Sequence, residues 1–502
     1  MKKLKKRILS LFLLSMFLCK SIFAQTALPE NSNYETDKTS ESLLLADDEN
    51  DGKKHWFSAF GGMLLFNVGL ATYNRYVIGS GWAKTGPDEW DHFWERRLAW
   101  DDDWYWTNFV LHPYQGSLYY MSARGSNLNV FESMLVTTIG SGFWEYLCET
   151  NAPSKNDMVY TTVGAFAVGE MMYRLSLAAD SKSRIAGFAL NPMRLWTEFA
   201  TGQKPKNPHG TIHELTLKAN AGTSQTYTNI LGSDKKVSMA NFDRSENYPI
   251  YGGFELYAVY NDPYTNDSNA PYNHFELKIG ASAGKGSGTG SDCNYPDIDK
   301  NLMYNIEIES NGFLWSRSPV FAENIDTSLG LIMEYDFDWH SFYLLTSLAP
   351  GLAVKQRINL EKSRFEWQLH GAWIALGTSD NYYLRRSLLT DWPTDNTIRF
   401  YSYTTGAESV LKLKYATDKG SNVAFDFHGY AMYDFYNQLK NGADVGWEFI
   451  GKGTLSAELA VSKSVLIGAA DRIFAKRTLY KHYPDVFEIM NSASVYAKWK
   501  FR

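Results

Sequence analysis

The chain has 502 residues, a formal net charge of −6 and no basic run beyond its extreme N-terminus, which argues against nucleic-acid binding. Its length exceeds that of one ordinary domain, and a mean hydropathy of −0.33 argues against a polytopic helical membrane protein. Phe, Trp and Tyr make up 15% of the residues, and aromatic side chains favour strands and membrane–water interfaces over loops.

The N-terminus has the pattern of a secretory signal peptide. Five Lys and Arg residues lie in Met1–Arg7, an apolar run follows over residues 8–18, and Ala24 precedes Gln25. The apolar run is too short to span a bilayer, so we expect a cleaved signal peptide over residues 1–24 and export of the chain. Residues 25–54 are polar and acidic with no apolar period, which predicts a disordered linker.

Beyond the signal peptide only two cysteines remain, Cys148 and Cys293. Two distant cysteines are not a disulfide framework. Two unpaired thiols are favoured, and a single bridge in an oxidising compartment stays open as the alternative.

Residues 55–205 carry a helical period and predict an apolar helical domain. Ser154 is expected to cap a helix, with Asp157 reaching back to it as in a capping box. The acidic run 101–103 is interpreted as capping a helix that begins at Trp104, with weak cation binding as the alternative. The expected helices are 56–74, 104–124, 127–149, 157–177 and a short last one from Asn191-Pro192 to Gly202.

From Thr211 the apolar period changes to 2, as expected for strands. Phe365, Trp367 and Leu369, for example, alternate with polar neighbours. Repeats of about 10–13 residues suit tilted strands that cross a bilayer. The fold predicted is α+β, a helical domain followed by an antiparallel transmembrane β-barrel of about twelve strands over residues 211–502. The residues expected to face the barrel lumen are Arg364, Glu366, Gln368 and His370.

The last strand closes on Trp499 and Phe501, which resembles the C-terminal signal that outer-membrane barrels present to their assembly machinery. Arg502 after the aromatic departs from that pattern, and an ordinary final strand is the alternative. The predicted location is the bacterial outer membrane, with membrane lipid and the barrel assembly machinery as partners.

The densest polar cluster falls in the helical domain. As a site for hydrolysis or proton transfer it offers the catalytic candidates His112, Glu145, Glu149, Asp157 and Glu170, with His112 or Glu149 as the base. As a buried salt-bridge network it would also use Arg124 and Arg174, with Glu145 and Glu149 on one helix face and Glu170 paired to Arg174. The structural interpretation is favoured. The ligand spacing fits no metal motif, so neither metal nor cofactor is expected.

These residues also carry a family resemblance. The stretch from Trp104 to Gly202 resembles an uncharacterised family of bacterial outer-membrane proteins, a domain of unknown function. The resemblance implies location and architecture and no reaction. A shorter stretch resembles VanZ-like membrane proteins, although Thr161 stands where Asn is typical and Pro153 replaces a basic residue. The residues that carry the first resemblance are His112-Pro113, Gly116, Tyr119-Tyr120, Ala123-Arg124, Trp144-Glu145-Tyr146, Glu149, Pro153-Ser154, Asp157, Gly164, Gly169-Glu170, Tyr173-Arg174 and Asn191-Pro192; the second uses Glu149, Ser154, Asp157, Gly164 and Gly169.

Three hypotheses follow. The first is a structural or transport role in the cell envelope, with the helices plugging the barrel or packing on it. The second is an outer-membrane enzyme that acts on lipid or another envelope substrate through the helical polar cluster. The third is an inner-membrane helical protein with a periplasmic β-domain. The first is favoured, and a small-molecule or lipid ligand fits either of the first two.

Overall fold

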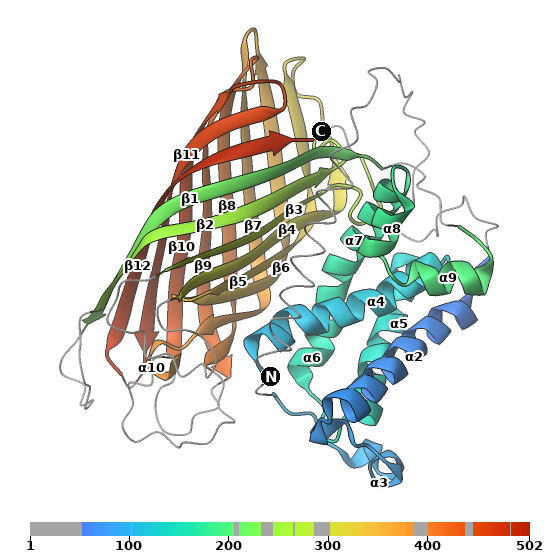
Figure 1. Cartoon of the computed structure of the whole chain (residues 1–502). Coiled ribbons are helices and arrows are strands. Elements are labelled where there is room, and N and C mark those ends of the chain that lie inside the picture. Colours follow the sequence, from blue (N-terminus) through green and yellow to red (C-terminus); the bar gives the residue numbers. More distant parts are fainter. Residues whose placement is uncertain are drawn as a thin grey trace. The chain divides into compact units, whose positions relative to one another are not determined.

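The computed structural model describes residues 53–101, 103–204, 210–231, 244–264, 267–285, 302–385, 400–436, 445–481 and 483–501. The predicted signal peptide, most of the predicted linker and Cys293 lie outside these residues. The described chain forms two compact units, one helical and one a barrel (Figure 1). Residues 103–106 group with the barrel although they lie between helices in the sequence.

The helical unit is built from short and medium helices. Within the described residues no helix is both long enough and apolar enough to cross a membrane. In chain order the elements are α2 (Trp56–Tyr73), η1 (Asn74–Ile78), η2 (Gly81–Ala83), α3 (Pro87–Asp91), η3 (Phe93–Glu95), η4 (Thr107–Leu111), α4 (His112–Gly125), α5 (Val130–Phe143), η5 (Trp144–Cys148), α6 (Lys155–Val159), η6 (Tyr160–Gly164), α7 (Ala165–Asp180), α8 (Arg184–Leu190) and α9 (Arg194–Thr201).

Helix α2 coincides closely with the expected helix, whereas π-helical turns interrupt the next three. The segments η4, η5 and η6 are π-helical and continue directly into or out of α4, α5, α6 and α7. The segment η1, directly after α2, is π-helical too. A π-turn inserts one residue into the i→i−4 ladder, which an apolar period of about 3.6 does not reveal. The elements α3 and α8 were not predicted.

Helices α4 and α7 pack closely because glycine stands at their contact. A Cβ atom on Gly116 would lie 1.9 Å from the carbonyl oxygen of Thr161 and 2.7 Å from the Cβ of Ala165. Gly116 lies one turn after His112, so this close approach brings the start of α4 against η6.

The barrel has twelve antiparallel strands and is closed by the pairing of β1 with β12. The predicted fold class is thereby confirmed. The strands are β1 (Ile212–Leu231), β2 (Arg244–Tyr260), β3 (Phe275–Lys285), β4 (Leu302–Arg317), β5 (Ile325–His340), β6 (Leu344–Leu360), β7 (Ser363–Asp380), β8 (Tyr401–Thr417), β9 (Asn422–Tyr436), β10 (Val445–Ala460), β11 (Val465–Tyr480) and β12 (Asp485–Lys500), and a short helix α10 (Tyr382–Arg385) follows β7.

The strands are 11 to 20 residues long, and most exceed the predicted length. In the sequence, the alternation of apolar and polar residues ends several positions before the hydrogen-bonded ladder between neighbouring strands ends. At the end of β1, for example, Thr228 pairs with Glu488 and Leu231 with Asp485. The sequence pattern therefore predicted the length of the apolar part of each strand and underestimated the length of the whole strand.

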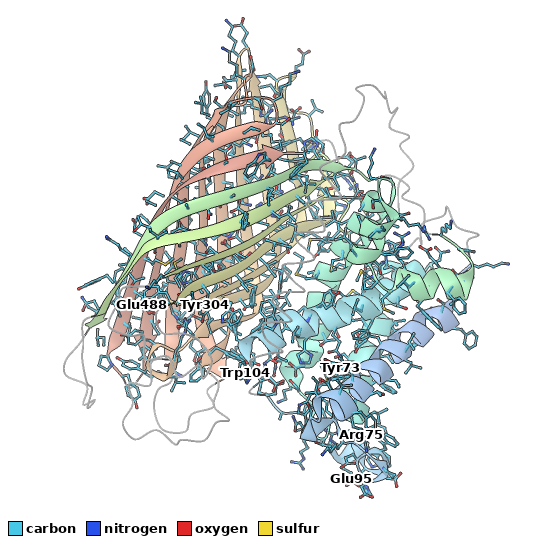
Figure 2. The ribbon with its side chains drawn as sticks, viewed as in Figure 1. Tyr73, Arg75, Glu95, Trp104, Tyr304 and Glu488 are labelled. Atoms are coloured by element: carbon cyan, nitrogen blue, oxygen red, sulfur yellow. The ribbon has the colours of Figure 1, made fainter. Side chains whose placement is uncertain are left out.

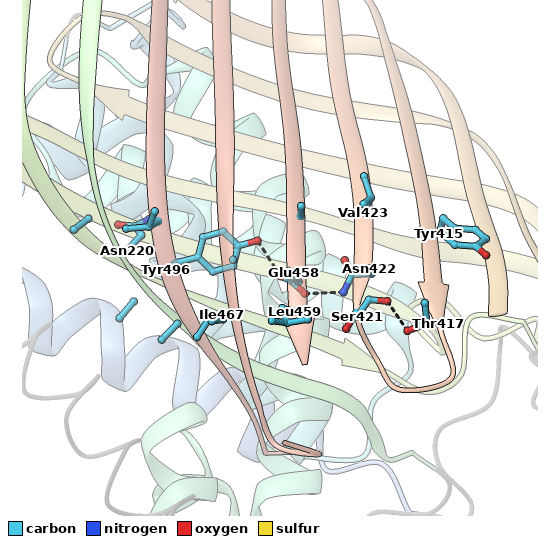
Figure 3. Close-up of a pocket in the computed structure, with 16 residues that line it drawn as sticks. Asn220, Tyr415, Thr417, Ser421, Asn422, Val423, Glu458, Leu459, Ile467 and Tyr496 are labelled. Carbon is cyan, nitrogen blue, oxygen red and sulfur yellow. Dashed lines mark hydrogen bonds between the residues drawn. The ribbon is translucent and has the colours of Figure 1, made fainter. Parts of the chain in front are cut away.

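The outward face of the barrel is apolar. Leu369 and Trp373 on β7 are 50% and 61% exposed, as expected for side chains that face lipid. Between β8 and β1, small residues such as Ala457 and Ala497 leave a shallow groove bordered by Val423 (Figure 3). A largely apolar exterior on a closed barrel, interrupted at positions such as the exposed pair Asp471 and Asn491, disfavours a periplasmic β-domain.

An aromatic cluster lies on this face near one rim. The ring of Tyr105 stacks on Phe337 at 5.2 Å, and its hydroxyl donates to the carbonyl of Asp338 at 3.1 Å. Trp339 packs at 5.4 Å from Trp106 and at 5.2 Å from Tyr304, which is labelled in Figure 2. These contacts explain why residues 103–106 belong to the barrel unit.

The lumen is crossed by side chains of the barrel itself. Tyr343, between β5 and β6, stacks at 3.8 Å on Phe474 of β11, and Lys452 of β10 donates to Asp338 of β5 at 2.8 Å. These pairs join strands from opposite sides of the closed order. The apolar layer around Phe474 consists of Phe342, Tyr343, Leu345, Ala349, Ile374, Tyr430, Met432, Ile450, Phe474 and Met490.

Candidate functional site

The structure divides the polar residues of the helical unit into two clusters. The first joins α4 to α7. Fully buried Glu170 accepts hydrogen bonds from Arg124 Nε at 2.9 Å, Arg174 Nε at 2.9 Å and the Tyr120 hydroxyl at 2.8 Å. Although burial alone would raise the pKa of Glu170, the two guanidinium groups hold it below its usual value. This arrangement is a satisfied buried ion network.

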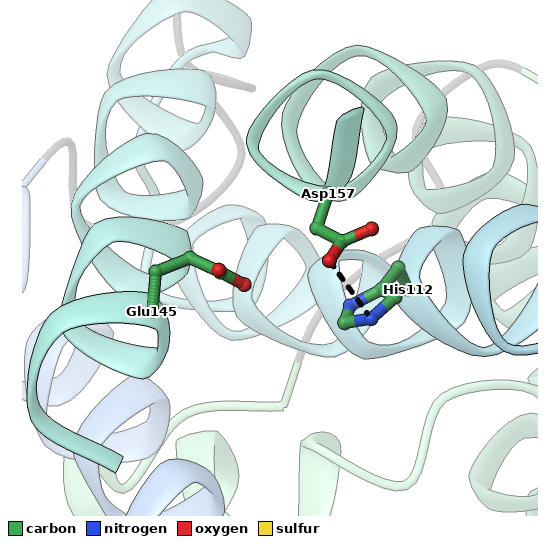
Figure 4. Close-up of side chains that lie close together, drawn as sticks. All are labelled: His112, Glu145 and Asp157. Atoms are coloured by element: carbon green, nitrogen blue, oxygen red, sulfur yellow. Dashed lines mark ion pairs between the residues drawn. The ribbon is translucent and has the colours of Figure 1, made fainter. Parts of the chain in front are cut away.

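The second cluster contains His112, Glu145 and Asp157, which point toward a common centre (Figure 4). One ligand-type atom from each lies within 4.8 Å of the others, and each side chain is at least nine-tenths buried. Asp101 joins this cluster through Asn156, whose amide donates to Asp101 at 3.1 Å and to Asp157 at 2.8 Å.

Three of the four π-helical segments among the described residues border this cluster. His112 directly follows η4, Glu145 lies within η5, and η6 begins three residues after Asp157. The Thr161 hydroxyl of η6 lies 3.5 Å from His112 Nδ1. Single π-turns are inserted frequently at functional sites, where they redirect side chains that a regular helix would place elsewhere.

The environments of these groups drive their pKa values apart. Burial lowers the pKa of His112 to about 4, with the charge of Asp101 opposing the shift. Burial and the charge of Asp101 raise the pKa of Asp157 well above its usual value. For Asp101, burial opposes a lowered pKa, but hydrogen bonds from Asp157, Asn108 and Asn156 lower it. The two shifts favour a protonated Asp157 beside a neutral imidazole, and His112 Nε2 lies 3.6 Å from Asp157 Oδ2.

Two expectations about this region were wrong in detail. Ser154 does cap α6, accepting from the Asp157 backbone at 3.1 Å, but the Ser154 backbone N–H donates at 2.7 Å to Glu145 and not back to Asp157. The buried carboxylate of Glu145 on η5 takes the place of Asp157 as the acceptor of this N–H, so the capping box does not form. Glu145 and Glu149 also do not share a helix face, because Glu149 lies past the end of η5 in extended conformation and accepts from Trp144 Nε1 at 2.6 Å.

Asp101 was missed as a site residue. The acidic run from which it comes was interpreted as a helix cap, yet the Asp101 side chain accepts from Asn108 at 2.9 Å as well as from Asn156. An aspartate near an asparagine is too common a local pattern to indicate a tertiary contact across more than fifty residues.

The remaining predicted residues lie elsewhere. On β7, Gln368 donates to Glu276 at 3.2 Å, His370 Nδ1 lies 2.6 Å from Glu334, and the guanidinium of half-exposed Arg364 pairs with Glu366 at 2.7 Å. Trp499 pairs in register with Leu217 and Val465, and Phe501 follows the end of β12. Cys148 is buried with a free thiol, and burial raises its pKa to about 12.

The His112 cluster meets the distance requirement of a cation site, but its oxygens are engaged by the protein. Glu145 accepts the Ser154 N–H, and Asp157 accepts the Asn156 amide and shares a proton with Asp101. A proton-sharing carboxyl pair suits acid–base chemistry better than metal binding.

The opposed pKa shifts predict opposed pH dependences of folding. Between pH 6.5 and about 4, His112 takes up a proton only on unfolding, so acidification weakens the helical unit. Asp157 keeps its proton only when folded, so acidification strengthens it. Each contributes at most about 1.4 kcal/mol per pH unit, and the two contributions oppose each other.

The substitutions Asp157→Asn and His112→Gln should expose these two slopes separately. In the Asp157→Asn variant the helical unit should lose stability on acidification, and in His112→Gln it should gain stability. Thermal unfolding of the whole protein in mild detergent, followed by the helical circular-dichroism signal, measures both. Parallel slopes in the two variants would show that the proton assignment is wrong.

Comparisons with known proteins bear on the helical unit. Residues 97–193 match the family described as Domain of unknown function (DUF3943). This stretch contains both polar clusters, and it confirms the resemblance to an uncharacterised family. The likeness to VanZ-like proteins stays a prediction. No curated protein sequence matches the chain.

Among solved structures, the COG4313 outer membrane channel from Pseudomonas putida F1 aligns at 12% identity over 56% of this chain and 95% of that chain, with a TM-score of 0.28. The transport unit of the autotransporter AIDA-I from Escherichia coli aligns at 9% identity over 57% and 90%, with a TM-score of 0.27. The outer membrane protease OmpT from Escherichia coli aligns at 7% identity over 58% and 98%, with a TM-score of 0.25. TM-scores this low carry no argument about this chain, so its identification as a membrane barrel depends on its own strand pairing and its exposed apolar residues. By those features the chain is an outer-membrane β-barrel protein with a helical region.

Proposed function

We propose that the helical unit is the functional part of the protein and performs acid–base chemistry on a lipid or another amphiphilic molecule of the envelope. The observation that carries the proposal is the cluster of protonated Asp157, neutral His112 and ionised Asp101, assembled by three π-turns. Titratable groups whose pKa values are driven apart by their surroundings are typical of acid–base pairs.

In this proposal Asp157 is the general acid and His112 the general base. Asp101, held by Asn108 and Asn156, keeps the proton on Asp157 as a positioning residue. His112 and Asp157 are 6% and 3% exposed, so substrate has to enter by local opening. The π-turns on either side, which are less regular than α-helix, are the segments where we expect that opening.

The surface of the helical unit favours an amphiphilic substrate. Phe131, Leu135 and Ile139 form an exposed stripe at i, i+4 and i+8 along α5 and are 53%, 51% and 43% exposed. On α9, Leu195 and Phe199 are 64% and 82% exposed. Apolar patches of this kind on a folded surface mark contact with membrane or apolar ligands.

The test compares the lipids of outer membranes from a strain that lacks the protein with those from the same strain carrying the wild type. Mass spectrometry should reveal a lipid species that the wild-type protein converts and the Asp157→Asn variant does not. Identical lipid profiles in all strains would defeat the proposal.

Transport through the barrel is the second candidate, and the lumen argues against an open pore. The stack of Tyr343 on Phe474 and the ion pairs of Lys452 span the lumen. The purified protein in planar bilayers should therefore show no stable open-pore conductance. The double substitution Tyr343→Ala and Phe474→Ala should raise the conductance, because it removes the two stacked rings.

The control for this experiment is Phe427→Ala, which removes an outward, 36% exposed ring from β9. It should leave the conductance unchanged. Heat-modifiable gel mobility checks that each variant forms a barrel. A large steady conductance of the wild type would restore the transport hypothesis.

A further inference from the structure

A second group of metal-ligand residues lies within the barrel and is independent of the helical site. Asp336 of β5, Glu408 of β8 and His428 of β9 each place one ligand atom within 4.8 Å of the other two. These three residues are 1%, 3% and 5% exposed. The paired strands β8 and β9 hold Glu408 and His428, and closure of the barrel brings Asp336 of β5 to them across the lumen. The three positions are 92 residues apart at the extremes, which is why the sequence predicted no metal site.

The protein satisfies only part of this group. Asp336 accepts from the Tyr430 hydroxyl through one oxygen at 2.5 Å, and Glu408 accepts from the Ser347 hydroxyl at 2.5 Å. The other oxygen of each carboxylate is buried and has no hydrogen-bond partner among the described residues. A buried unsatisfied carboxylate oxygen is costly, and two such oxygens in one group with a buried imidazole suggest a missing ligand.

The local charges point to a cation. Within the described chain neither Asp336 nor Glu408 makes an ion pair with Lys or Arg, and the only charged partner of Asp336 within 4.0 Å is the His428 imidazole, at 3.6 Å. The negative charges of Asp336 and Glu334 both repel the carboxylate of Glu408. His428 Nε2 itself faces Asp426 at 3.1 Å and Glu309 at 3.8 Å, so the imidazole is surrounded by carboxylates.

We propose that Asp336, Glu408 and His428 bind a divalent transition-metal ion such as Zn²⁺ within the barrel. One imidazole nitrogen and two carboxylate oxygens match the ligands that Zn²⁺ accepts, whereas Ca²⁺ and Mg²⁺ favour all-oxygen sets. The ion would cross-link β5, β8 and β9 from inside and neutralise the two carboxylates.

The experiment uses the full-length protein without a histidine tag, purified in detergent and stripped of metal. After addition of Zn²⁺ and removal of the excess, elemental analysis should find one bound Zn²⁺ per chain. Each of Asp336→Asn, Glu408→Gln and His428→Gln should weaken the affinity by about tenfold or more, since each removes one ligand. Cobalt-substituted protein should show visible absorption that the same variants lose.

Two histidine substitutions serve as matched controls. His340→Gln changes another buried barrel histidine, which bonds the Phe342 backbone at 2.9 Å, and His112→Gln changes the helical site. Both should keep the metal. Heat-modifiable gel mobility confirms that each variant folds. If the wild type binds no more Zn²⁺ than His428→Gln does, the imidazole carries the compensating charge as a cation and the metal site is refuted; loss of the metal in His112→Gln alone would also refute it.

Discussion

Replacement of Asp157 by Asn should reduce turnover of the envelope substrate by about 10²–10⁴-fold, the range that a positioned general acid contributes. Asn has nearly the same shape as Asp and can still bond to Asp101, but it has no proton to transfer. His112→Gln should cause a loss of similar size through the base. Because the two residues act as a pair, the double variant should be little worse than either single variant.

The measurement is the conversion rate of the affected lipid species in isolated outer membranes. The matched control is Glu132→Gln, which changes the partner of Lys54 at the start of α5; the Glu132 side chain is 21% exposed and lies outside the cluster. It should retain wild-type activity. Full activity of Asp157→Asn in a correctly folded protein would remove Asp157 from the role of acid.

Replacement of Glu170 by Ala should destabilise the helical unit by about 3–5 kcal/mol, because it leaves two guanidinium groups buried without their shared carboxylate. Arg124 is 5% exposed and Glu170 is fully buried, so water cannot readily replace the lost contacts. Glu170→Gln should cost less than Ala, since its amide oxygen can still accept one hydrogen bond.

Lys54→Ala provides the comparison for a surface pair. The Lys54 side chain is 40% exposed, so loss of its contact with Glu132 should cost only about 0–1 kcal/mol. Thermal unfolding of the whole protein, read from its helical circular-dichroism signal, measures all three variants. Equal stability of Glu170→Ala and Lys54→Ala would show that the Glu170 network does not hold α4 and α7 together.

The sequence by itself determined the class of this protein. Alternation such as that of Phe365, Trp367 and Leu369 predicts strands with one apolar face, because successive side chains in a strand point to opposite sides. The approximate strand number, the change of period near Thr211 and helix α2 could be predicted for the same reason. Each of these features is local, and the number and type of elements follow from patterns within about twenty residues.

The tertiary structure alone decided which polar residues act together. His112, Glu145 and Asp157 were among seven candidates, and the separation of this cluster from Arg124, Glu170 and Arg174 depends on how the π-turns rotate the helices. Asp101 joins the cluster only because Asn156, distant in sequence, hydrogen-bonds to it. Asp336, Glu408 and His428 meet only because the sheet closes into a barrel. Contacts between distant segments depend on the packing of whole elements, and a single sequence carries no local pattern for them.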